Sequence, residues 1–383
     1  MDDSFRHLPL ARMEEMVARF EEEVLAAQLA APPSSALISK AVHRHGTERC
    51  PVWLRRVTPD LVIRHGDALI DLFREFPDDL GRVAPYDLMI GYQGPGDAKP
   101  ISAVRAYMGD SEWRNEWGVT WRHIVGGVGA IAVGNPLRDW SQLDDYLAHL
   151  PDPDAPGRLE AALAPAQALR TAGKYSFGLF GSVLYDVFSI RGMENAFVDF
   201  YEHAAEMRRL IGALVQYALR LIRRWREVGV DALLLLDDWG TERSTMISPG
   251  AWREFFKPAY QALFDEVHRC GMDAFLHTCG NVVDIIEDLI EVGLDVLDPV
   301  QTSAMDIEEL ARRFGGRISF CGTIDVQHLL PSAAPQMVKD TIRRTMDVLG
   351  RPFGNALILA PTNTITPEVP LANLRAMFEA CHA

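Results

Sequence analysis

The chain has 383 residues, 48% hydrophobic and 24% charged, a composition typical of a globular protein with a sizeable core. Its formal net charge of −15 disfavours a nucleic-acid backbone or an anionic membrane surface as a partner. The sequence contains no apolar run long enough to span a membrane.

The amino-terminal stretch and the cysteines indicate the compartment. Residues 1–24 are acidic and amphipathic, unlike a signal peptide or a transit peptide, so we expect a cytoplasmic protein. An odd number of scattered cysteines is typical of thiols or metal ligands rather than of a disulfide framework. The five are Cys50, Cys270, Cys279, Cys321 and Cys381.

The first part of the chain gives few periodic signals. Apolar residues recur at helical spacing over residues 8–30, and the "APPSS" stretch at 31–35 ends that pattern. We therefore expect an N-terminal helical extension over 1–45, followed by one domain over 46–383. Further along, residues 86–92 predict a buried strand and 126–133 a strand or a glycine-rich connection, while 151–157 predict a surface loop.

The second half alternates strands and helices. Buried strands are predicted at 174–181, 230–240, 273–280, 295–301, 317–325 and 355–363. Helices are predicted at 194–228, 249–270, 281–293, 306–316 and 334–350, with a last one starting at Thr366-Pro367. Continuous apolar strands alternating with helices indicate a parallel sheet covered on both faces. With five successive βα units and no GxGxxG or P-loop motif, we expect an α/β fold, a (β/α)8 TIM barrel.

The strand ends carry a candidate metal site. His277 and Cys279 lie two apart at the end of a strand, so their side chains point to the same side. Thiolate and imidazole are preferred zinc ligands, and Cys321, which closes a later strand, is the natural third. The alternative is that the cysteines are apolar core residues and the histidine a hydrogen-bond partner.

Two aspartates end the preceding strand. Asp237 and Asp238 follow four leucines, and adjacent residues on a strand face opposite ways, so we expect only Asp238 to enter the mouth of the barrel. There it would act as a general base, orient the substrate or bind the metal. The structural alternative is a cap for the following turn.

Four stretches together resemble the uroporphyrinogen decarboxylase superfamily, which includes cobalamin-dependent methyltransferases. They are "DALLLLDDWGT", "FLHTCGNVVDIIEDLIEVGLDVLDPVQ", "FCGTIDVQHLLP" and "PEVPLANLRAMFEA". The resemblance is clear over about residues 175–383. It implies the same barrel, with the site at the carboxyl ends of the strands, and a homodimer.

Two departures separate the chain from the decarboxylase branch. The decarboxylases carry an R-Q-A-G-R segment, which is absent here; the nearest stretch is "CPVWLRRVTP" with Arg55 and Arg56. They also end their last strand in a G-H-G-like turn, where this chain has "APTNT". His277 and Cys279 match the H-x-C zinc motif of the methyltransferases. Their later cysteine would fall at Thr362 or Asn363, one strand after Cys321, so the third zinc ligand is in question.

Further candidates surround the predicted mouth. The resemblance makes Tyr185 a substrate-pocket residue, and we add Asp237, Trp117, Gln301 and Asn363 as substrate-binding candidates. Trp113, Trp117 and Trp121 lie in a predicted loop leading into a strand, where core packing is the alternative role. His123, His328 and Arg191 are lesser candidates.

These features predict a zinc-dependent methyltransferase, with Asp238 and His277 as catalytic residues. It would move a methyl group between a corrinoid, such as methylcobalamin or one on a partner corrinoid protein, and a thiol or a methoxylated small molecule, the latter by O-demethylation. A metal-free decarboxylase or lyase and a corrinoid- or tetrapyrrole-binding protein without catalysis are the alternatives.

Overall fold

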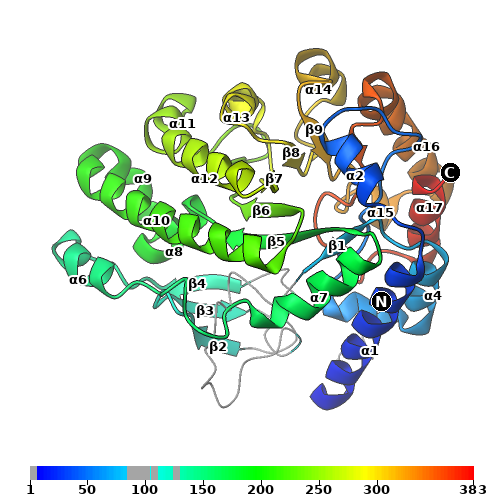
Figure 1. The fold of residues 1–383 in the computed structure, drawn as a ribbon, viewed down its shortest axis with the longest axis horizontal. Coiled ribbons are helices and arrows are strands. Elements are labelled where there is room, and N and C mark those ends of the chain that lie inside the picture. The colour runs from blue at the N-terminus through cyan, green and yellow to red at the C-terminus, as the bar shows by residue number, and fades with distance from the viewer. Residues whose placement is uncertain (1–6, 84–103, 105–110, 124–129) are drawn as a thin grey trace.

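A computed structural model describes residues 7–83, 104, 111–123 and 130–383 of the chain (Figure 1). The strand expected over 86–92 lies outside the described residues, as does the first part of the 126–133 stretch.

Seven parallel strands form a curled sheet, in the order in which they occur in the chain. Residues 49–57 form a closing segment between its two edges. Trp53 N donates to the Leu359 carbonyl over 2.9 Å, and Asp79 N donates to the Val52 carbonyl over 2.9 Å. This segment therefore closes the sheet into the expected barrel. The strands are β1 (Leu80–Arg82), β5 (Tyr175–Gly181), β6 (Ala232–Leu236), β7 (Asp273–His277), β8 (Val296–Asp298), β9 (Ser319–Cys321) and β10 (Leu357–Ile358).

Helices surround the barrel (Figure 1). They are α3 (Pro59–His65), α4 (Asp67–Glu75), α7 (Glu160–Thr171), α8 (Leu184–Arg191), α9 (Met193–Glu202), α10 (Ala204–Val228), α11 (Pro249–Phe255), α12 (Lys257–Arg269), α13 (Ile286–Glu291), α14 (Ile307–Phe314), α15 (Leu329–Ser332), α16 (Pro335–Thr345) and α17 (Leu371–Cys381). Short helical turns are η3 (Val283–Ile285), η4 (Met346–Gly350) and η5 (Arg351–Phe353).

Three expected helix boundaries were wrong. The helix predicted over 194–228 is two, α9 and α10, interrupted at His203, and the one over 249–270 is interrupted at Phe256 before a new start at Lys257-Pro258. The last helix begins at Leu371 rather than at Thr366. The Ile365 and Pro367 carbonyls accept bonds from Thr58 N and Arg64, which hold this stretch outside the helix. By contrast, Ser248 caps α11 as expected, accepting from Ala251 N over 3.1 Å.

The N-terminal helices α1 (Leu10–Ala30) and α2 (Ser35–Val42) precede the closing segment. Ile38 and Val42 of α2 join the apolar cluster inside the barrel, and Ser319 Oγ at the start of β9 donates to the Ala41 carbonyl over 2.8 Å. α2 therefore covers the end of the barrel where the strands begin. The boundary of a separate extension over 1–45 stays a prediction.

An insertion between β1 and β5 carries a three-stranded antiparallel sheet of β2 (Ser111–Arg114), β3 (Thr120–His123) and β4 (Ala130–Gly134). η2 (Trp140–Gln142) and α6 (Leu143–Ala148) follow it. Trp113 and Trp121 are opposite each other on β2 and β3, so the expected loop is a hairpin, with Gly118 at φ 78° in its turn. Among the described helices, none is both long and apolar enough to cross a membrane.

Candidate metal centre

A cleft of about 440 Å³ opens at the carboxyl ends of the strands, where barrel enzymes place their sites. The loops after β6, β7, β8, β9 and β10 supply its walls. The lining residues are Asp238, Gly240, Thr241, Glu242, Cys279, Gly280, Gln301, Val326, Gln327, Thr362 and Asn363.

Two glycines allow the loops after β6 and β7 to touch at the base of this cleft. A Cβ added at Gly280 would lie 2.4 Å from the carbonyl carbon of Gly240, and one added at Gly240 would lie 2.6 Å from Asn281 N. Gly280 also has φ 81°, which side chains disfavour. The backbones can approach this closely only without side chains, and this approach brings Asp238 next to Cys279.

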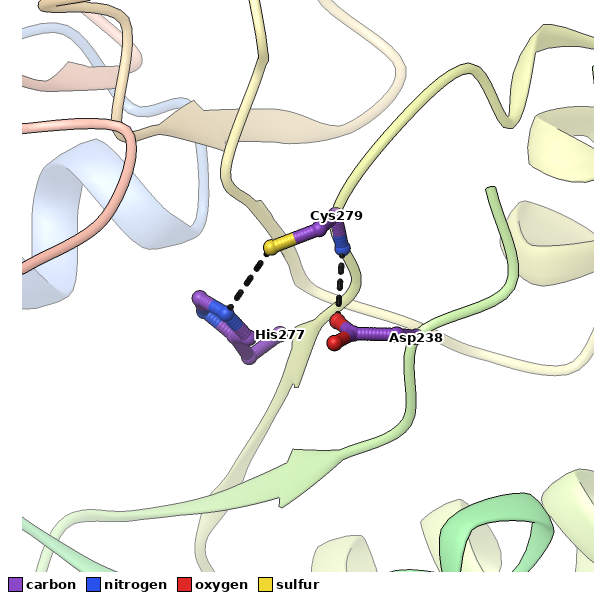
Figure 2. A group of neighbouring side chains, drawn as sticks. All are labelled: Asp238, His277 and Cys279. Carbon is purple, nitrogen blue, oxygen red and sulfur yellow. Dashed lines mark hydrogen bonds between the residues drawn. The ribbon is translucent and has the colours of Figure 1, made fainter. Parts of the chain in front are cut away.

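Asp238, His277 and Cys279 converge in Figure 2, with their potential ligand atoms all within 4.8 Å of one another. Cys279 Sγ lies 3.5 Å from His277 Nε2, and Cys279 N donates to Asp238 Oδ1 over 2.9 Å. Asp238 is exposed, while His277 and Cys279 are half-buried. The prediction that Asp238 is the aspartate entering the mouth agrees with this placement.

The donor set fits zinc. With Zn–S near 2.3 Å and Zn–N near 2.0–2.1 Å, sulfur and nitrogen ligands of a tetrahedral ion lie about 3.5 Å apart. This is the separation found between Cys279 Sγ and His277 Nε2. A carboxylate oxygen of Asp238 would complete three protein ligands of types that zinc accepts and would leave a fourth position open.

The carboxylate of Asp298 bonds to the ring nitrogen of His277 that does not face Cys279. His277 Nδ1 lies 2.7 Å from Asp298 Oδ2, and Asp298 Oδ1 accepts from a terminal nitrogen of Arg56 over 2.8 Å. Burial by itself raises the pKa of Asp298, but the Arg56 and His277 charges outweigh it and lower that pKa to about 2. The pKa of His277 rises to about 10, because bonds to Asp298 and Cys279 outweigh its burial. With this pKa, His277 carries a proton on Nε2 as well as on Nδ1 at neutral pH, and a bound metal would displace the Nε2 proton.

Cys321, the expected third ligand, is not in the converging group found among the described residues, although its thiol lies beside Asp298. It is fully buried in the apolar cluster inside the barrel, and burial raises the pKa of its thiol well above the usual value. The group that converges on Cys279 contains Asp238 instead. A role for Cys321 as a ligand stays a prediction.

Asp237 faces away from the cleft. It is buried and accepts hydrogen bonds from Val183 N, Tyr185 N and the Tyr260 hydroxyl, the last over 2.8 Å. Burial raises its pKa to about 6. These bonds connect the end of β6 to the start of α8 and to α12. Asp237 therefore has a structural role next to the site rather than a place in the cleft.

Gln301 and Asn363, two of the proposed substrate-binding residues, line the cleft. Gln301 Oε1 accepts from Gly280 N, and its amide donates to Glu242, both over 2.9 Å. Asn363 Nδ2 donates to Cys279 Sγ over 3.5 Å. Both amides therefore contact the loop that carries Cys279.

The remaining candidates lie outside this group. Tyr185 stacks on Trp121 with ring centroids 5.7 Å apart, and Trp117 is buried against Tyr217 at 4.7 Å. The side chains of the lesser candidates have other surroundings: His123 is buried in β3, His328 is exposed near Asp325, and Arg191 is buried and paired with Asp199. Trp117 has the core-packing surroundings that were the alternative to a substrate role.

Arg56 and the partnership between Asp298 and His277 were missed by reasoning from the sequence. The partnership between Asp298 and His277 could have been predicted, because both residues end neighbouring strands. In the structure the two are register partners in the parallel sheet. Arg56 carries no local signal, because it meets Asp298 only when the barrel closes.

Residues 123–383 match the family described as uroporphyrinogen decarboxylase (URO-D). The chain is 24% identical over 196 residues to a methylated-thiol–coenzyme M methyltransferase of Methanosarcina mazei, covering 50% of this chain and 48% of that protein. It is 25% identical over 182 residues to a methylcobamide:CoM methyltransferase of Methanosarcina barkeri, covering 48% of each.

The decarboxylases are equally similar. The chain is 27% identical over 186 residues to a uroporphyrinogen decarboxylase of Pseudomonas aeruginosa, covering 48% of this chain and 49% of that enzyme. Each alignment thus spans about half the length of the curated relative. A solved methyltransferase from Methanosarcina mazei superposes with a TM-score of 0.66 at 16% identity, over 92% of this chain and 99% of that one, and shares the fold.

Proposed function

The chain belongs to the uroporphyrinogen decarboxylase family, and from that premise we propose that it is a zinc-dependent methyltransferase linked to a corrinoid. The observation that carries the proposal is the convergence of Asp238, His277 and Cys279 at ligand distances. The names of two relatives, one for methylated thiols and one for a methylcobamide, support the methyl donor and acceptor classes.

Zinc at this position would act as a Lewis acid, polarising a methoxyl oxygen or lowering the pKa of a thiol. The residues of the chain would orient the metal ligand and bind the substrate. Asp298 holds the His277 ring so that Nε2 faces Cys279 Sγ, and the amides of Gln301 and Asn363 line the space where a small substrate would lie. The cleft would open toward a corrinoid, either free or on a partner protein.

Arg56 bears on the choice between the two branches of the family. The decarboxylases that this chain resembles use N-terminal arginines to hold substrate carboxylates. Here the Arg56 side chain is 8% exposed and is bonded to the buried Asp298, so its charge is already neutralised within the protein. This favours methyl transfer over decarboxylation of a polycarboxylate. The cytoplasmic location and the homodimer stay predictions.

The test is metal content by plasma mass spectrometry of the parent protein and of single variants. We expect about one zinc per chain, lost in His277→Ala and Cys279→Ser and reduced in Asp238→Asn, which keeps an acceptor for Cys279 N but removes the charge. Cys321→Ser decides between Asp238 and Cys321 as the third ligand. We expect this variant to retain zinc, because Asp238 would still be present.

Activity is then assayed with methylcobalamin and small thiols. We expect methyl transfer that depends on zinc and is absent in Cys279→Ser. A parent protein free of metal after purification and after zinc addition would contradict the proposal.

A further inference from the structure

We infer that Arg56 and Asp298 form a positioning unit that aims the Nε2 atom of His277 at Cys279. The inference rests on the proposed function, since the atom so aimed is the proposed metal ligand. It adds a residue of the N-terminal half to a site whose other members all come from the second half of the chain.

The three groups form one continuous chain of short contacts. Arg56 donates to one carboxylate oxygen of Asp298 over 2.8 Å, and the other oxygen lies 2.7 Å from His277 Nδ1. The side chains are 8%, 0% and 18% exposed, in the order Arg56, Asp298 and His277. Because the Asp298 carboxylate is wholly buried, it depends on both partners to offset the loss of its hydration.

Arg56 is itself held rigidly. Its guanidinium lies 3.7 Å from the centre of the Trp53 ring, and a second terminal nitrogen donates to the Pro361 carbonyl over 3.3 Å. Its backbone carbonyl accepts from Ile365 N over 2.7 Å. Arg56 thus extends from the segment that closes the barrel, with contacts to the end of β10 on one side and to Asp298 on the other.

The geometry specifies what the unit does. With Asp298 accepting from Nδ1, the proton stays on that nitrogen, and Nε2 is the atom that faces Cys279 Sγ at 3.5 Å. Without Arg56, the Asp298 carboxylate would lose the donor that holds its Oδ1 and would be free to rotate. His277 would then lose the acceptor that fixes the plane of its ring.

Zinc affinity, measured by competition with a chromophoric chelator, tests the unit in the full-length protein. We expect Arg56→Met and Asp298→Asn to weaken zinc binding 10- to 100-fold, and Arg56→Lys to recover part of that loss. The Co²⁺ absorption bands of these variants should shift, which a purely structural role would leave unchanged.

Arg49→Met is the matched control. Arg49 makes a two-pronged ion pair with Asp79 at 2.6 and 2.8 Å, at the other end of the same closing segment and away from the cleft. We expect Arg49→Met to lower the melting temperature while zinc affinity stays within twofold of the parent. Unchanged affinity in Arg56→Met, or an equal loss in Arg49→Met, would overturn the inference.

A second readout separates this inference from the proposed function. If the parent protein binds no zinc, the proposed function fails, and the positioning unit is tested by NMR of His277. We expect a downfield, exchange-protected Nδ1–H proton that disappears in Arg56→Met and persists in Arg49→Met. Its persistence in Arg56→Met would overturn the inference with or without metal.

Discussion

In the loop after β10, an uncharged amide lies beside the thiol of the candidate metal centre. Asn363 Nδ2 donates to Cys279 Sγ over 3.5 Å. The methyltransferases that the chain resembles have their later cysteine near this strand, so the amide stands where a second thiolate would be expected. Asp238, from the opposite side of the cleft, is the group that converges there instead.

The substitution Asn363→Cys should therefore strengthen metal binding. Because the Asn363 amide already contacts Cys279 Sγ, a thiol at this position would add a second sulfur ligand, which zinc prefers to a neutral amide. We expect zinc affinity to rise at least tenfold, measured by chelator competition. The control is Thr362→Cys, since the Thr362 side chain is buried and accepts from Val326 N. Equal gains in both variants would mean that the added thiol acts elsewhere.

At the scale of the elements, the barrel wall depends on the fit of α10 against β5. Trp225 of α10 is fully buried, and its ring occupies the space beside Gly178 of β5, where an added Cβ would lie 2.7 Å from ring atoms. A strand glycine of this kind marks close approach by a neighbouring group.

Gly178→Ala should accordingly destabilise the protein by about 1–3 kcal/mol through overpacking. Gly212→Ala, in α10 itself, is the matched comparison, because nothing lies within 4 Å of the added Cβ. We expect it to stabilise the protein by about 0.5–1 kcal/mol through helix propensity. Chemical denaturation measures both, and effects of the same sign would contradict this account of the packing.

A buried carboxylate just before β1 also makes stability depend on pH. Asp78 accepts from Leu54 N and Arg55 N over 2.7 and 2.8 Å and is 4% exposed. Burial raises its pKa to about 7, despite the opposing effect of these two bonds. Because the pKa is higher in the folded state, the contribution to stability is complete below about pH 4 and is lost as the pH rises through 7.

Asp78→Asn lacks this titration. Its free energy of unfolding, relative to that of the parent, should improve by about 4 kcal/mol between pH 4 and pH 8, at 1.36 kcal/mol per pKa unit. Urea denaturation at several pH values measures the difference. A difference that does not vary with pH would show that Asp78 is ionised in the folded protein throughout this range.

At the scale of the whole molecule, the candidate site joins distant parts of the chain. Arg56 comes from the closing segment, His277 and Cys279 from the end of β7 and the loop after it, and Asn363 from the loop after β10. A ligand that binds across these parts stabilises the folded state, because the unfolded chain does not assemble them.

Zinc should therefore raise the melting temperature of metal-free protein. At a free concentration 100 times the dissociation constant, the stabilisation is about 2.7 kcal/mol. It should grow with pH, since binding displaces protons from the histidine and the thiol. Scanning calorimetry with and without chelator measures the effect, with Cys279→Ser as the control. A shift of equal size in that variant would place the metal elsewhere.

Much of the barrel was predictable from local patterns, because continuous apolar strands alternate with helices over the second half. Helix boundaries were less so: His203 interrupts one expected helix without a proline or glycine signal, whereas Pro258, just after Phe256, was a signal for the second interruption that went unused. In the candidate site, His277 and Cys279 followed from spacing along one strand, since residues two apart share a side.

The sequence by itself determined the alternation that makes the barrel, and it predicted the pair His277 and Cys279 and the choice of Asp238 over Asp237. Only the tertiary structure decided which groups meet that pair. Asp238 reaches it because Gly240 and Gly280 let two loops touch, Cys321 lies inside the barrel, and Arg56 joins the site through closure between the chain's two halves. Spacing along the chain specifies neighbours on one strand, whereas contacts between strands depend on register and closure, which the whole fold sets.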